Sequence, residues 1–392
     1  MNDTKIKDKE YIASTYNRFC VEIVDGKGSL CYDETGKEYI DLTSGIGVNS
    51  FGFCDEIWQN AINEQIKKFQ HTSNLYYTKP CADLAEMLCN KTGMKKVFFS
   101  NSGAEANECA IKAARKYAAD KKGAEYNKIV TLTNSFHGRT LTTLAATGQD
   151  HYHELFNPLT PGFYHIDAND ELYELEVIAS REKIAAVMIE CIQGEGGVVA
   201  LKEDFVKKVY DYCQKRDIIF IVDEVQTGNG RTGKLYSYMN FGIKPDIVTT
   251  AKGLGGGLPI GATLLGDKVK DVFGFGDHGS TFGGNPISAS GAISILKRID
   301  DAFLNEVLEK SQYVFNELQG SKGIKSVSGM GLMIGIETVR PASEVINECI
   351  KKGVLCLSAK SKVRLLPALN IKYEQLQKAI SIIKEVCSEY SE

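Results

Sequence analysis

Residues 218–222 read Ile-Ile-Phe-Ile-Val, an apolar run without any alternation that ends directly before Asp223. A strand with one face in water alternates apolar and polar residues, whereas a strand buried on both faces does not. Segments with helical spacing occur at residues 104–119 and 205–214. They alternate with further strand-like runs at residues 97–99, 128–132, 184–189, 246–250 and 260–265. This pattern predicts an α/β fold with a mostly parallel sheet covered by helices on both faces.

The chain changes character after Gly284. Long helical segments and short strand-like runs follow, at residues 286–299, 304–318, 331–337 and 363–366. Near the N-terminus we expect a hairpin or meander, because glycines separate the short runs at residues 21–24, 29–32 and 38–42. We therefore expect an N-terminal segment (residues 1–48) that packs with the small domain, a large domain (49–284) and a small α+β domain (285–392).

Composition narrows the class of protein. The net charge of -4 argues against a nucleic-acid partner, which favours a basic surface. The 11 cysteines include no Cys-x-x-Cys pair, so reduced thiols are expected rather than disulfides or a metal site. Residues 1–10 lack the apolar core of a signal peptide, and no apolar run approaches the roughly 18 residues of a membrane span. We expect a cytoplasmic protein without a membrane partner.

Two residues at predicted strand ends carry specific chemistry. Asp223 ends one strand, and Lys252 lies in the turn Ala-Lys-Gly-Leu-Gly-Gly-Gly after another. Ligands of parallel sheets bind at the carboxyl ends of the strands, which would bring both side chains to one site. A lysine can form a Schiff base with an aldehyde, and a carboxylate can keep a pyridine nitrogen protonated so that the ring accepts electrons. Together they indicate pyridoxal 5'-phosphate (PLP) as the cofactor.

A phosphate site is predicted where a strand meets a helix, at residues 100–105, Ser-Asn-Ser-Gly-Ala-Glu. Backbone N–H groups at a helix N-terminus bind anions, and Gly103 allows close approach. The simpler interpretation is a capping box in which Ser102 caps the helix and Glu105 lies three residues on. The two interpretations are compatible.

Several other residues are candidates for stacking or for binding carboxylates. Phe136 could stack on a cofactor ring and Arg139 could hold a substrate carboxylate, although a loop with a surface arginine is the simpler interpretation. Glu195 lies among glycines, as it would in a tight turn, and Arg364 lies inside an apolar strand, where it requires an anion. Residues 228–233, Gly-Asn-Gly-Arg-Thr-Gly, match a dinucleotide fingerprint only formally, because residues 223–227 separate them from the strand.

The assembled motifs resemble class III aminotransferases of fold type I over essentially the whole chain. The matching stretches are residues 26–29, 39–42, 101–108, 135–140, 192–198, 222–228, 251–257 and 279–286. The resemblance implies a seven-stranded sheet in the large domain and an enzyme that transfers amino groups with PLP.

The resemblance also assigns roles to single residues. Lys252 would bind the cofactor aldehyde and shuttle a proton, and Asp223 would pair with the pyridinium nitrogen. The resemblance places the remaining cofactor contacts at Gln226 on the ring hydroxyl, Phe136 and Val225 on the two ring faces, and Ser102, Gly103 and Ala104 on the phosphate. In the family a threonine of the neighbouring subunit completes the phosphate site, and Thr281 matches it. A homodimer with shared active sites is therefore expected.

Substrate binding follows from the same resemblance. Tyr16 and Arg139 would hold the donor's α-carboxylate. Glu195 would neutralise Arg364 while the donor is bound, and would swing away when 2-oxoglutarate enters. Tyr16, Arg139, Asn107 and Glu195 favour N-acetylornithine as the donor, with a place in arginine biosynthesis. Ornithine, succinyl-diaminopimelate and 4-aminobutyrate stay open as donors. A PLP-binding regulator is a further alternative, but the chain has neither the spare length nor a basic segment for a DNA-binding module.

Overall fold

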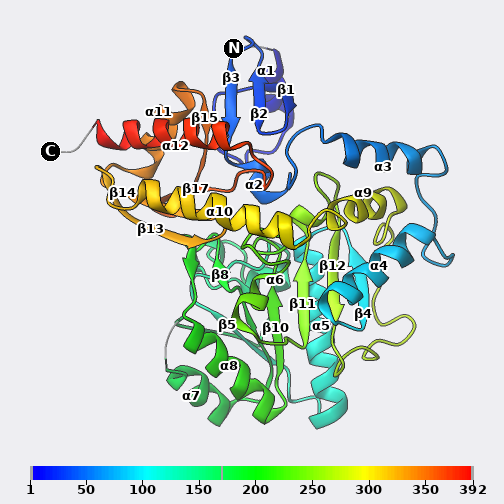
Figure 1. Ribbon diagram of the computed structural model, residues 1–392. Coiled ribbons are helices and arrows are strands. Elements are labelled where there is room, and N and C mark those ends of the chain that lie inside the picture. The colour runs from blue at the N-terminus through cyan, green and yellow to red at the C-terminus, as the bar shows by residue number, and fades with distance from the viewer. Residues whose placement is uncertain (1–2, 169–170, 390–392) are drawn as a thin grey trace.

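A seven-stranded sheet forms the centre of the larger lobe of the computed structural model, which describes residues 3–168 and 171–389 (Figure 1). Six strands run parallel, and β12 is antiparallel to both of its neighbours. The strand order is β4 (Lys96–Ser100), β12 (Gly261–Leu265), β11 (Ile247–Thr250), β10 (Ile219–Asp223), β7 (Ile184–Ile189), β5 (Lys128–Leu132) and β6 (Phe163–Ile166). The predicted α/β class, the seven strands and the mostly parallel sheet are confirmed.

The apolar runs of the sequence arise because both faces of this sheet are covered. Ile219 and Ile221 lie in a core with residues of α5 (Gly103–Lys122). The alternate residues Phe220 and Val222 lie in a second core with residues of α8 (Glu203–Arg216). The helices α3 (Glu56–Ile66), α4 (Lys79–Thr92), α6 (Leu141–Ala146) and α7 (Tyr173–Arg181) complete this lobe. Since every residue of β10 is buried, water-facing polar positions do not occur along it.

The second lobe combines residues from the two ends of the chain, as the blue and red ribbons show near the top of Figure 1. One sheet has the order β13 (Ile324–Met330), β14 (Met333–Thr338), β17 (Lys362–Leu365) and β16 (Leu357–Ala359). The other has the order β1 (Ile23–Lys27), β2 (Leu30–Asp33), β3 (Glu38–Asp41) and β15 (Val354–Leu355). The packed helices are α10 (Asp301–Leu318), α11 (Ala342–Lys351) and α12 (Tyr373–Ser388).

Short elements connect these layers. They are α1 (Asp3–Tyr11), α2 (Ser44–Gly47), η1 (Asp150–Tyr152), β8 (Ile192–Gln193), β9 (Val199–Ala200), η2 (Ser237–Phe241) and η3 (Lys252–Leu254). Helix α9 (Pro286–Leu296) packs against α3 and α4, and its buried residues belong to the core of the larger lobe. The division of the chain after residues 48 and 284 stays a proposal.

Six strands were missing from the sequence-based prediction, and all of them lie at sheet edges: β6, β8, β9, β13, β15 and β16. Strand β6 ends the large sheet and β13 ends one of the smaller sheets. The eleven cysteines are all free. Within residues 3–168 and 171–389, no helix is long and apolar enough to cross a membrane.

Candidate active site

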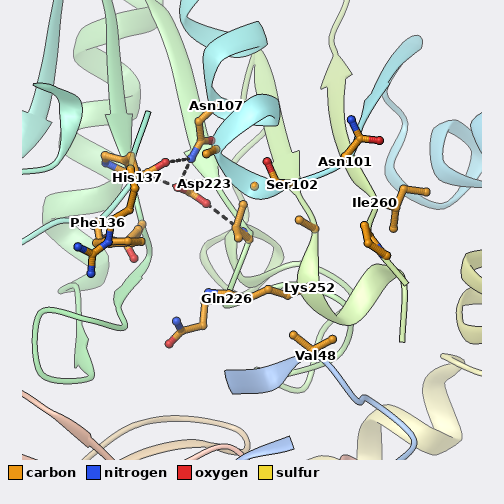
Figure 2. Close-up of a pocket in the computed structure, with 18 of the residues that line it drawn as sticks. Val48, Asn101, Ser102, Asn107, Phe136, His137, Asp223, Gln226, Lys252 and Ile260 are labelled. Atoms are coloured by element: carbon orange, nitrogen blue, oxygen red, sulfur yellow. Dashed lines mark hydrogen bonds and ion pairs between the residues drawn. The ribbon is translucent and has the colours of Figure 1, made fainter. Parts of the chain in front are cut away.

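A cavity of about 600 Å³ opens at the carboxyl ends of the parallel strands. Most of the residues singled out in the sequence line it: Tyr16, Ser102, Gly103, Ala104, Phe136, Arg139, Asp223, Val225, Gln226 and Lys252. Figure 2 shows Asp223 beside Asn107 and His137, with Lys252 further along the pocket toward Val48. The topology of the fold therefore brings together side chains that are separated by more than 200 residues in the sequence.

Asp223 is the most constrained group in this cavity. One of its carboxylate oxygens accepts hydrogen bonds from Asn107 Nδ2 and His137 Nδ1, each at 2.8 Å. The other oxygen accepts from the backbone N–H of Val225 at 2.9 Å. The Thr249 hydroxyl donates to Asn107 Oδ1 at 2.7 Å and so fixes the orientation of the amide. Asp223 is 3% exposed, and these donors hold its carboxylate in one orientation.

His137 contributes charge as well as a hydrogen bond. Burial alone would lower the pKa of His137, but the hydrogen bond and the charge of Asp223 raise it above its usual value. Its backbone carbonyl accepts from Asn107, and its backbone N–H donates to the Thr147 hydroxyl. His137 belongs to the motif at residues 135–140, from which no role for it is predicted. No periodic signal could have assigned one, because its partner Asp223 is 86 residues away.

Lys252 begins η3, directly after β11, and has a left-handed backbone with φ of 44°. Such a conformation is strained in a residue with a side chain, and such strain concentrates at functional sites. The side chain is only partly exposed, and burial lowers its pKa. The charges of Glu195 and Asp223 act against this effect, whereas that of Arg364 reinforces it. A lowered pKa makes an amine a better nucleophile near neutral pH.

The loop before α5 forms a helix cap and leaves backbone N–H groups at the helix N-terminus available to an anion. The Ser102 hydroxyl accepts from the backbone N–H of Glu105 at 3.2 Å. The Glu105 carboxylate accepts from the backbone N–H of Asn101, one residue before the cap, which differs from a strict capping box. By position, the N–H groups of Gly103 and Ala104 have no intrahelical acceptor.

Gly103 is required in this loop for a reason that the structure makes visible. A Cβ atom on Gly103 would lie 2.6 Å from a methyl carbon of Val225. The loop and Val225 are therefore so close that a residue with a Cβ atom does not fit at position 103 unless Val225 or the loop shifts.

Glu195 and Arg364 meet beside this cavity rather than in its lining. Arg364 Nη1 donates to Glu195 Oε1 at 2.5 Å and to Gln226 Oε1 at 3.2 Å, and the Gln226 amide donates to Glu195 at 3.2 Å. Burial raises the pKa of Glu195, but the charge and the hydrogen bond of Arg364 lower it below the usual value. The Nε of Arg364 is buried and has no hydrogen-bond partner among the described residues. The Nε–H group of Arg364 is therefore available to a further hydrogen-bond acceptor.

Arg139 and Tyr16 lie at the exposed side of the cavity. The Arg139 guanidinium carbon lies 4.3 Å from the centroid of the Tyr152 ring and 5.7 Å from that of Phe136. No carboxylate within the described ranges lies at salt-bridge distance from Arg139. Tyr16 is 74% exposed, in an N-terminal segment whose residues 11–20 are all exposed.

Thr281 is the one predicted cofactor residue that lies away from this cavity in its own chain. It lines a different cavity, with His71, Asn74 and His278. Residues 228–233 are likewise not part of the lining of the active-site cavity. Arg231 is buried and donates to the backbone carbonyls of Leu332 and Pro367, so this loop joins the two lobes.

Comparisons with known proteins give the family. The sequence profile of the family Aminotransferase class-III matches residues 11–387. The chain is a class III aminotransferase. It is 49% identical over 393 residues to the acetylornithine aminotransferase of Haemophilus ducreyi, a match that covers 99% of this chain and 100% of the relative. The resemblance found in the sequence, and the enzyme class it implied, a PLP-dependent aminotransferase, are confirmed.

Solved structures of other aminotransferases share the fold. The ornithine aminotransferase of Toxoplasma gondii ME49 superposes with a TM-score of 0.94 at 30% identity, covering 98% of this chain and 94% of that one. The acetylornithine aminotransferase of Elizabethkingia anophelis superposes with a TM-score of 0.87 at 30% identity, covering 99% and 98%. Since both specificities occur on this fold, the donor substrate has to be argued from the site.

Proposed function

We propose that this class III aminotransferase transfers the amino group of N-acetylornithine to 2-oxoglutarate, giving N-acetylglutamate 5-semialdehyde and glutamate. The observation that carries the proposal is the pairing of a neutralised arginine, Arg364 with Glu195, and an arginine without a carboxylate partner, Arg139, at one cavity. The 49% identity to a relative named acetylornithine aminotransferase supports this donor above ornithine. We also propose a cytoplasmic location and a role in arginine biosynthesis.

The residues present fit PLP as the cofactor. Asp223 would hold the ring nitrogen and Gln226 the ring hydroxyl, while Phe136 and Val225 would lie on the two ring faces. Ser102 and the N–H groups of Gly103 and Ala104 would hold the phosphate, where the close approach of Gly103 to Val225 leaves no room for a side chain. When bound, PLP supplies an aldehyde that condenses with amines and a ring that accepts electrons.

Each residue of the site would then have a different role in the reaction. Lys252, with its pKa lowered by burial, would act as the nucleophile and afterwards move a proton at the substrate's reacting carbon. Asp223 would keep a positive charge on the ring, and His137 and Asn107 would keep Asp223 in place. Arg139 and Tyr16 would hold the α-carboxylate of the donor. Glu195 would release Arg364 only for 2-oxoglutarate, whose two carboxylates need two cations.

We propose that a second copy of this chain completes the site. Thr281 is exposed and lies outside the cavity of its own chain, as it would if it reached a partner's phosphate loop. Large apolar side chains close to it in the sequence or the cavity are exposed, among them Phe282 at 59% and Leu75 at 89%. Burial of such side chains between two copies would stabilise a homodimer.

The test is a single-turnover measurement with each amine separately. The purified yellow enzyme is mixed with N-acetylornithine, ornithine, succinyl-diaminopimelate or 4-aminobutyrate, and the loss of visible absorbance is followed. We expect N-acetylornithine to react at least about tenfold faster than the others at equal concentration, which corresponds to about 1.4 kcal/mol. 2-Oxoglutarate should then restore the absorbance. Faster reaction of ornithine or 4-aminobutyrate would overturn the proposed donor, and a PLP-binding regulator would not respond to any amine.

A further inference from the structure

Tyr152 lies directly behind the arginine that faces the cavity. Its ring centroid is 4.3 Å from the guanidinium carbon of Arg139, and its ring meets that of Phe136 edge to face at 5.8 Å. Arg139 lines the cavity and Tyr152 does not. Both rings contact the Arg139 guanidinium, Phe136 from within the cavity lining and Tyr152 from outside it.

Tyr152 is itself well anchored. It ends η1, and its backbone N–H donates to the carbonyl of Gln149 at 3.0 Å. The Gln149 side chain is 5% exposed and donates to the backbone carbonyl of Ser135, next to Phe136. The segment that carries Tyr152 is thus joined by hydrogen bonds to Ser135, in the loop that carries Phe136 and Arg139.

Two other arginines that contact aromatic rings have additional partners, whereas Arg216, 3.9 Å over the Tyr212 ring, resembles Arg139 in having no side-chain hydrogen bond or salt bridge within the described ranges. Arg298 lies over Phe51 and forms a salt bridge with Asp55, and Arg115 lies over Phe163 and donates to two backbone carbonyls. For Arg139, no hydrogen bond or salt bridge is present among the described residues, and the rings are what orients it. A cation over a ring face gains electrostatic stabilisation and keeps its N–H donors available at the edge of the guanidinium plane.

We propose that Tyr152 is a positioning residue for substrate recognition: its ring face holds the Arg139 guanidinium ready to bind the carboxylate of the amino donor. This inference rests on the proposed function, in which Arg139 binds that carboxylate. A guanidinium fixed before binding loses less conformational entropy when the carboxylate arrives, and the ring strengthens the cation's hold once water is excluded. Tyr152 would therefore affect binding of the carboxylate and leave the reacting amine untouched.

The test compares two amines that differ only in this carboxylate, N-acetylornithine and N-acetylputrescine. In the holoenzyme, Tyr152→Leu should raise the half-saturating concentration of N-acetylornithine about 3- to 30-fold and leave that of N-acetylputrescine within about twofold. Tyr152→Phe, which keeps the ring, should behave like the wild type with both amines. Calorimetric binding of N-acetylnorvaline, which has the carboxylate but no reacting amine, should weaken by the same factor in Tyr152→Leu.

The outcomes separate this inference from the proposed function. Equal effects of Tyr152→Leu on the two amines, or no effect on either, would overturn the role of Tyr152. If Tyr152→Phe lost as much affinity for N-acetylornithine as Tyr152→Leu, the effect would belong to the hydroxyl. That result would also overturn the proposed role of the Tyr152 ring. Arg139→Ala is the reference: if it fails to discriminate the two amines, the proposed carboxylate role of Arg139 fails. Tyr152→Met, which keeps much of the volume without an aromatic face, replaces Tyr152→Leu if that variant does not fold.

Discussion

The two ends of the active-site cavity are built on different physical principles. The floor, which we define as Asp223, His137 and Asn107, is at most 3% exposed and joined by hydrogen bonds of 2.8 Å. The rim, defined as Tyr16 and Arg139 of the cavity lining together with the neighbouring pair Glu195 and Arg364, includes side chains as different as Tyr16, 74% exposed, and Arg364, 3% exposed. The floor keeps one carboxylate in one orientation, whereas the rim combines an arginine paired with a carboxylate, Arg364, with one that lies against aromatic rings, Arg139.

The difference reflects what each end has to bind. A cofactor ring presents the same nitrogen in both halves of an amino-transfer reaction, so the floor needs one arrangement. The amino donor and 2-oxoglutarate present different numbers of carboxylates, so the rim needs two. The contacts of the two rim arginines agree with this proposal, because Arg364 is paired with Glu195 and Arg139 lies against aromatic rings. We therefore expect substitutions in the floor to reduce all activity and substitutions in the rim to change selectivity.

The largest effect should come from the floor. Asp223→Asn keeps the shape but removes the charge that faces the ring nitrogen and His137. Breaking a buried charge pair costs about 3–5 kcal/mol, so the single-turnover rate should fall by about 10²–10³-fold with every amine. Asp246→Asn is a matched control, because Asp246 is also buried but lies outside the cavity lining, near Lys268. Retention of more than a tenth of the wild-type rate in Asp223→Asn would contradict the assignment of the floor.

A smaller and selective effect is expected at the rim. Glu195→Ala leaves Arg364 without its partner, which favours the dicarboxylate and disfavours the donor. A charged hydrogen bond contributes about 1.5–3 kcal/mol, so the rate of the donor half-reaction relative to that with 2-oxoglutarate should fall about 10- to 100-fold. Both half-reactions are measured by stopped-flow absorbance, with the exposed Glu154→Ala as control. If neither half-reaction slowed, Glu195 would have no part in the exchange between donor and 2-oxoglutarate. If both slowed equally, it would act, like the floor, on a step common to both half-reactions.

The sequence predicted the parts of this molecule that local patterns encode. Central strands such as β10 are buried along their whole length, and so their apolar runs are unmistakable. The edge strands β6 and β13 have only one neighbour and partly exposed residues, and their mixed composition concealed them. The strand predicted from Gly331 begins at Met333, because Gly331, with φ of 61°, lies in the turn between β13 and β14.

Contacts between distant segments of the chain limited how much of the site could be predicted from the sequence. The residues that would touch the cofactor came from motifs at strand ends and from a family resemblance. The residues that support them, His137, Asn107 and Tyr152, act through contacts with residues from other segments, and no spacing rule reaches across such separations. The family resemblance relates Asn107 to the choice of donor substrate. In the structure its side chain donates hydrogen bonds to Asp223 and to the backbone carbonyl of His137, so it supports the floor.

The smallest effect concerns a second carboxyl group next to the floor. Glu190 follows β7 and accepts a hydrogen bond from the backbone N–H of Phe136 at 3.0 Å. Burial, with the nearby charge of Asp223, raises its pKa to about 7, although His137 and two backbone hydrogen bonds act in the opposite direction. Among the described residues, the hydrogen bonds that stabilise the Glu190 carboxylate come from backbone N–H groups alone, and burial outweighs them.

Because the folded state binds this proton more tightly than the unfolded state does, the protein should lose stability as the pH rises from about 4.5 to 7. Glu190→Gln cannot titrate, so the difference in Tm, variant minus wild type, should increase between pH 5 and pH 8. The change in free energy is about 1–3 kcal/mol, or roughly 1–4 °C for a chain of this length, and thermal unfolding of the holoenzyme at both pH values measures it. The exposed Glu86→Gln should show no such trend. If the Glu190→Gln difference is also independent of pH, Glu190 is ionised throughout this range and belongs with Asp223 as a fixed charge of the floor.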